Sequence, residues 1–83
     1  MTLRFTPARS RLVHGQIWHP DQQIVHVEDG SLLLTLPASH PAEILMSILG
    51  HGAEVEVLAP VWLREQVRGE IKRMGQRYGE GEG

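Results

Sequence analysis

Two adjacent residues near the middle of the chain, Asp29-Gly30, constrain the fold more than any other feature. Both residue types tolerate the positive φ angles of a type I′ turn, and alternating apolar segments flank them at residues 23–28 and 31–36. A two-residue loop would pair Val27 with Leu32 and Val25 with Leu34. The predicted inner face then holds Val25, Val27, Leu32, Leu34 and Leu36, and the outer face Ile24, His26, Leu33 and Thr35.

Other patterns place one strand and one helix before this hairpin, and a helix, a strand and a final helix after it. The predicted ranges are a strand at 2–5, a helix at about 7–15, a helix from 41 ending at Gly50-His51-Gly52, a strand at about 53–58 and a helix at 60–78. Thr6-Pro7 is typical of a helix start, because Thr caps the first turn and Pro needs no N–H partner there. The order is therefore β-α-β-β-α-β followed by one more helix.

This order predicts an α+β fold: a ferredoxin-like βαββαβ antiparallel sheet with two helices on one face plus an additional C-terminal helix. The last helix carries an apolar stripe of Leu63, Val67, Ile71, Met74 and Tyr78. It is surplus to the sandwich, so we expect it to pack on a sheet edge, on the far face or against another chain. One domain at residues 1–78 and a disordered tail at 79–83 are expected.

Composition excludes several classes of protein. The chain has 83 residues, which suits one domain, and no cysteine, which excludes disulfides and thiolate chemistry. No apolar run is long enough to span a membrane, so we expect a cytoplasmic protein without membrane contact. The net charge of −2 hides basic ends around an acidic middle. Such polarity favours docking onto charged surfaces over general nucleic-acid binding.

No catalytic or metal-binding motif is present in the sequence. The five histidines show no HExxH spacing and no close ligand pair on a helix, so we expect no metal and no cofactor. No serine lies in a recognisable nucleophile turn, and the loop after the first strand lacks the glycine-rich phosphate loop of acylphosphatases. We therefore expect a protein without enzymatic activity.

Two groups of residues are candidates for binding. Arg4, Arg11, His19 and Gln22 form a predicted ligand or nucleic-acid cluster near one end of the sheet. A predicted partner or dimer interface contains Ile24, His26, Leu33, Trp62, Arg64 and Arg68. Arg64 and Arg68 begin a basic stripe that continues to Lys72, which suits either a solvated helix face or an acidic neighbour.

Residues 17–78 resemble the C-terminal extension of WYL-domain transcriptional regulators, known as WCX. The segments that carry the resemblance are Trp18–Gln22, Glu28–Leu32, Ile48–Gly52, Val55–Pro60 and Leu63–Glu65, and Leu3–Phe5 extends it. The resemblance implies a ferredoxin-like module that follows a winged-helix domain and a WYL domain. It also implies a role in dimerisation and in the response to a ligand, which in several members is a nucleic acid.

The leading hypothesis, which follows from this resemblance, is a regulatory and dimerisation module of a WYL-type regulator that assists effector sensing. We expect a homodimer, and DNA binding by upstream domains of the parent chain. The alternative is an ACT-like small-molecule sensor, with a pocket at a dimer seam lined by His51, Gly52 or the first loop. Autonomous binding of single-stranded nucleic acid is a third possibility, disfavoured because the sheet has no pair of exposed aromatic residues.

Overall fold

The computed structural model describes residues Met1–Gly79 and contains four strands, three α-helices and one short 3₁₀ turn. In chain order these are β1 (Thr2–Phe5), α1 (Pro7–His14), β2 (Gln23–His26), β3 (Leu32–Thr35), α2 (Pro41–His51), η1 (Gly52–Glu54), β4 (Val55–Ala59) and α3 (Val61–Arg77). The element order matches the predicted one. Of the predicted tail at 79–83, residues 80–83 lie outside the described range.

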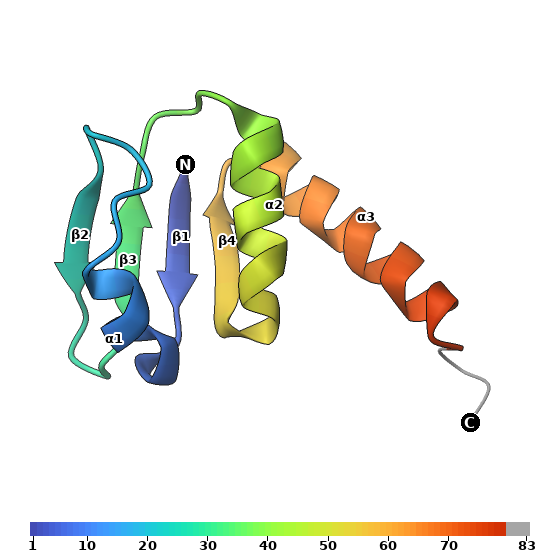
Figure 1. Cartoon of the computed structure of the whole chain (residues 1–83), viewed down its shortest axis with the longest axis horizontal. Helices are drawn as coiled ribbons and strands as arrows, with labels where there is room; N and C mark the ends of the chain where they lie inside the picture. Colours follow the sequence, from blue (N-terminus) through green and yellow to red (C-terminus); the bar gives the residue numbers. More distant parts are fainter. Residues whose placement is uncertain (80–83) are drawn as a thin grey trace.

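The strands form one antiparallel sheet in the order β2-β3-β1-β4, which confirms the α+β class. Helices α1 and α2 lie together in front of the sheet, while α3 leaves the end of β4 and runs away from it (Figure 1). Strands β2 and β4 are the two edges. The N-terminal strand β1 is central, with Leu3 paired to both Leu34 and Val57.

The hairpin differs from the prediction by one residue in register. Val25 pairs with Leu33 and Ile24 with Leu34, so the predicted pairing of Val25 with Leu34 is wrong. The reason is a three-residue loop: the Gly30 N–H donates to the Val27 carbonyl at 2.9 Å, and the Val27 N–H donates to the Ser31 carbonyl at 2.9 Å. Gly30 has φ of 91°, the left-handed position that completes a type I turn with a bulge.

This register reverses the faces of β2. A one-residue shift moves every side chain of a strand to the other side of the sheet. Ile24 therefore packs against the core, whereas Val25 is 57% exposed on the outer face beside Leu33. The predicted outer set of Ile24, His26 and Leu33 does not share one face.

The core lies between the sheet and the two front helices. Its fully buried side chains include Leu3, Phe5, Leu32 and Leu34 from the sheet, and Val13 and Ile48 from α1 and α2. Arg4, between Leu3 and Phe5, alternates to the outer face and is exposed. The strands β1 and β3 thus bury one face and leave the other open.

Helix α1 begins as the sequence predicts. The Thr6 side chain accepts a hydrogen bond from the Arg9 N–H, and Pro7 occupies the first turn. The predicted glycine at the end of the second helix is also present, because Gly52 has φ of 60° where α2 ends and η1 begins. Here a left-handed backbone without strain requires glycine.

Helix α3 is divided between the core and solvent. Leu63 in its first turn is completely buried, and Val67 packs against the core. Farther along, Ile71 is 58% exposed and Met74 is 47% exposed. The beginning of α3 therefore closes the core beyond β4, and only its later turns fit the expectation of a helix without a partner.

Within residues 1–79, none of the helices combines the length and apolar character that a bilayer crossing requires.

Candidate functional site

A cleft of about 620 Å³ lies between the α1–β2 loop and α2. Its walls come from Gln16, Ile17 and Trp18 on the loop and from Glu43, Ile44, Ser47, Gly50 and His51 on α2. Segments that lie about thirty residues apart in the sequence meet here. The cleft is therefore a product of the tertiary fold.

One side chain, Gln22, holds the loop wall in place. Its Oε1 accepts hydrogen bonds from the Trp18 N–H at 2.7 Å and the His19 N–H at 3.3 Å. Its Nε2 donates to the Gln16 carbonyl at 2.9 Å, and Gln16 Oε1 in turn accepts from the Trp18 indole at 3.1 Å. Because these bonds close the loop on itself, the backbone around Trp18 is fixed.

Aromatic rings form the end of the cleft. The Trp18 ring lies nearly parallel to the His51 ring, with centroids 5.6 Å apart and an interplanar angle of 18°. Phe5 meets both rings edge-on, at 5.7 Å from Trp18 and 5.2 Å from His51. The stack links the cleft to the central strand, since Phe5 belongs to β1 and is fully buried.

His51 is held in its neutral form. Partial burial lowers the pKa of its imidazole, and the nearby positive charge of Arg9 lowers it further. An Arg9 nitrogen lies 3.4 Å from His51 Nδ1. Because a guanidinium only donates, Nδ1 must accept, and the proton of the ring resides on Nε2. The neutral ring can therefore offer one N–H to a ligand.

The chemistry of the cleft suits a small planar ligand with hydrogen-bonding groups. Trp18, His51 and the 81% exposed Ile17 provide apolar and aromatic surface. Glu43 and Ser47, both exposed on α2, provide a carboxylate and a hydroxyl. No set of three histidine or acidic side chains in residues 1–79 is arranged to hold a metal ion.

The predicted ligand cluster is separated into three places. Arg4 lies on the outer face of β1, Arg11 is exposed on α1, and His19 and Gln22 lie together in the α1–β2 loop. Gln22 builds the wall of the cleft, and His19 Nδ1 accepts from the Asp21 N–H at 3.0 Å. No hydrogen bond in the described residues joins Arg4 or Arg11 to this loop.

Arg4 instead fastens the hairpin to the central strand. Its guanidinium lies 2.6 Å from the Asp29 carboxylate and 3.4 Å from the Ser31 hydroxyl. The Ser31 N–H also donates to Asp29 at 2.8 Å. Hydrogen bonds from Ser31, and to a smaller extent the Arg4 charge, lower the pKa of Asp29. The sequence analysis predicted that Arg4 binds a ligand. Its actual partner, Asp29, could not be identified until the register of the β2–β3 hairpin was known.

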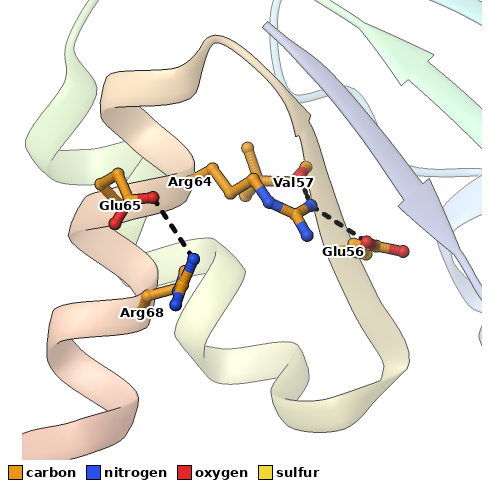
Figure 2. Close-up of polar contacts among 5 residues, drawn as sticks. All are labelled: Glu56, Val57, Arg64, Glu65 and Arg68. Carbon is orange, nitrogen blue, oxygen red and sulfur yellow. Dashed lines mark hydrogen bonds and ion pairs between the residues drawn. The ribbon is translucent and has the colours of Figure 1, made fainter.

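The basic stripe of α3 meets the edge of the sheet. Figure 2 shows Arg64 reaching β4, where Nη1 donates to the Glu56 carboxylate at 3.0 Å and to the Val57 carbonyl at 2.8 Å. Arg68 lies one turn farther and contacts Glu65 at 3.5 Å. Arg64 thus satisfies an edge carbonyl that would otherwise be open to pairing.

The predicted interface residues also lie on separate surfaces. Ile24 faces the core side, and the His26 ring approaches His14 of α1 at 5.1 Å. Leu33 lies on the outer face of the sheet, half-buried. Trp62 is 45% exposed in the first turn of α3, as expected for a side chain without a covering partner.

Sequence reasoning missed most of the cleft. It used Trp18 as part of the WCX resemblance and gave His51 a binding role only in the ACT-like alternative, whereas Gln16, Glu43 and Ser47 were not singled out. No local pattern connects Trp18 with His51, because their contact depends on how α2 crosses the sheet. One feature of the sequence could have indicated the cleft: Trp18 lies in a polar loop, and tryptophan is enriched at binding surfaces, where its indole N–H finds a hydrogen-bond partner.

The comparison with protein families gives a clear result. The model of the WCX domain matches residues 1–75, which covers most of the chain and confirms the resemblance indicated by the motifs. A comparison with curated proteins found no match. The chain belongs to the WCX domain family.

Proposed function

We propose that this chain is the C-terminal regulatory module of a WYL-domain transcriptional regulator, and that it assists effector sensing and dimerisation without enzymatic activity. The match to the WCX domain over residues 1–75 carries the proposal. Upstream WYL and winged-helix domains of the parent chain would contact DNA, which implies a cytoplasmic location. The arrangement of the sheet is also consistent with this role.

We assign the sheet to the ferredoxin-like plan expected of such modules. In the strand order β2-β3-β1-β4, β3 lies between β1 and β2 and is antiparallel to both. The connection from β1 through α1 to β2 is then a split βαβ unit, and α2 joins β3 to β4 in the same manner. This support comes from topology alone.

The effector would bind in the cleft beside Trp18 and His51. A ligand stacked there changes the indole environment, so Trp62→Phe leaves Trp18 as the single fluorescent reporter. We expect an effector to shift Trp18 emission and raise the melting temperature in a thermal-shift screen of nucleotides, short oligonucleotides and amino acids. Trp18→Leu should abolish the thermal shift, while Arg11→Ala, outside the cleft, should preserve it.

The screen also separates the two functional classes. A selective response to an amino acid would support an ACT-like sensor, for which Glu43, Ser47 and His51 would supply polar groups. A response to nucleotides or oligonucleotides supports the leading proposal. Absence of any response that depends on Trp18 would refute an effector site in this cleft.

Dimerisation would use the outer face of the sheet. With the observed register, Val25 and Leu33 are cross-strand neighbours on this face. Helices α1 and α2 both lie on the opposite side of the sheet (Figure 1). Sedimentation of the chain at micromolar concentration should show a dimer that Val25→Lys disrupts. Ile17→Lys, which alters another exposed apolar residue, is the matched control. A monomer at all concentrations would contradict this part of the proposal.

A further inference from the structure

A second hollow lies between α2 and α3 and differs from the cleft in chemistry. It is a groove of about 360 Å³ whose main walls are Ile48 and Leu49 from α2, Val55 from β4, and Val67, Ile71 and Met74 from α3. The two helices diverge toward the end of α3 (Figure 1). Its lining includes no charged residue.

Two large apolar side chains that line the groove are exposed to solvent. Ile71 is 58% exposed and Met74 is 47% exposed, although both continue the stripe that begins with the buried Leu63. Val67 to Met74 extends over about 12 Å of helix axis, or about two turns. The groove thus offers the length and the two-helix walls that receive an amphipathic helix.

The border of the groove is basic. A smaller hollow of about 150 Å³ adjoins it, shares Val55, Val67 and Ile71 with it, and adds two basic residues, Arg64 and Arg68, together with Glu56 and Val57. Lys72 continues this flank at the next turn of α3.

Acidic side chains near the groove have basic or polar partners. Glu56 pairs with Arg64, Glu65 with Arg68 and Glu70 with Arg73, and Glu54 accepts a hydrogen bond from Thr6. The only acidic residue of α2, Glu43, lines the other cleft. Because α3 carries five basic residues against two acidic ones, the field beside the apolar groove is positive on balance, and Arg68 and Lys72 lie on the flank next to it.

This charge distribution selects among possible occupants. In a two-fold pair of antiparallel α3 helices, the same flank of each helix meets its copy, so Arg68 and Lys72 would face like charges. The segment 79–83 contains only glycine and glutamate, so it has no apolar side chain to fill the groove. A partner with apolar residues flanked by carboxylates would fill the groove with apolar side chains and would place opposite charges beside Arg68 and Lys72.

We propose that the α2–α3 groove docks an acidic amphipathic helix of another polypeptide, which inserts apolar side chains between Ile48 and Met74 and places carboxylates beside Arg68 and Lys72. This site is separate from the cleft and from the outer sheet face used in the proposed function. Its occupant is not an effector and not a second copy of this chain.

The test uses the whole chain and two labelled peptides of about 14 residues, or four helical turns. Both carry the same leucines at i, i+3, i+4 and i+7; one has glutamates on the flanks and its twin has lysines. In fluorescence anisotropy we expect the acidic peptide to bind at least about fivefold more tightly than the lysine twin, with affinity falling as salt rises. Equal affinity, or no binding by the acidic peptide, overturns the proposal.

Two methionine variants separate docking from simple charge attraction. Met74→Lys places a polar ammonium in the groove, whereas Met46→Lys adds the same charge on α2 outside it. General attraction of an acidic peptide would strengthen with either variant. Docking predicts about tenfold weaker binding for Met74→Lys and no loss for Met46→Lys. Circular dichroism verifies that both variants fold.

A charge reversal completes the test. Arg68→Glu should weaken the acidic peptide and strengthen its lysine twin, which a purely structural effect would not do. If instead the unmodified chain self-associates and Met74→Lys makes it monomeric in sedimentation, a second copy occupies the groove and the proposal is wrong. A dimer sensitive to Val25→Lys and insensitive to Met74→Lys supports separate surfaces.

Discussion

The contribution of α3 to the core can be measured by removing Leu63, its one completely buried side chain. Truncation of a buried leucine to alanine costs about 2–5 kcal/mol, because transfer energy is lost and a cavity remains. Stability of about 0.05–0.15 kcal/mol per residue gives a chain of 83 residues about 4–12 kcal/mol in total. We therefore expect Leu63→Ala to remove about a sixth or more of the stability and to lower Tm by about 8 °C at least.

The assay follows urea unfolding with two probes in the Trp62→Phe background. Trp18 fluorescence reports the core beside Phe5, and far-UV circular dichroism reports helix content. If Leu63 closes the core, both transitions shift together to lower urea. Met74→Ala is the control, and we expect less than about 1 kcal/mol because Met74 is 47% exposed. A Trp18 transition that does not move while helix signal is lost early would refute the reasoning and make α3 an independent appendage.

Three further predictions concern the hairpin, the cleft and pH. Gly30→Ala should lower the free energy of unfolding by about 1–2 kcal/mol in urea titration, since φ is 91° and the new Cβ would lie 3.1 Å from Pro7 Cβ. Gln22→Ala should cost about 1–3 kcal/mol by the same measurement and shift Trp18 emission, because donors of the loop lose their acceptor. Stability should fall on acidification from neutral pH through about 6.5, because His51 binds a proton more readily in the unfolded chain than in the folded one, where its pKa is lowered. In thermal melts, His51→Gln should reduce this dependence of Tm on pH.

Local signals in the sequence determine the elements well. The strand at residues 2–5 and the helix after Thr6-Pro7 were predicted at their observed positions, because alternation and capping act within a few residues. The location of the hairpin was predicted correctly, but its register was not. Asp-Gly suits both a two-residue loop and the second half of a three-residue loop, and the choice depends on the hydrogen bond from the Ser31 N–H to Asp29.

That single residue of register explains why Ile24 and His26 do not lie with Leu33 on the outer face. The outer-face assignment of Ile24 and His26 followed from the assumed loop, and both moved to the helix side when the loop gained a residue. The ligand cluster failed to gather for a different reason. Arg4 lies on the outer face of β1, whereas His19 lies in the α1–β2 loop beside the cleft.

The charges along the chain are better understood from the structure than from the totals. The acidic middle of the sequence does not form one acidic surface: Asp29 meets Arg4, Glu56 meets Arg64, and Glu43 borders the Trp18 cleft. The basic stripe of α3 loses Arg64 to the sheet edge and keeps its positive field only where the helix leaves the core. Exposed apolar surface begins at the same place, since Leu63 is buried and Met74 is not. Because the two properties coincide on the outer half of α3, that half is suited to a partner, while the inner half stabilises the fold.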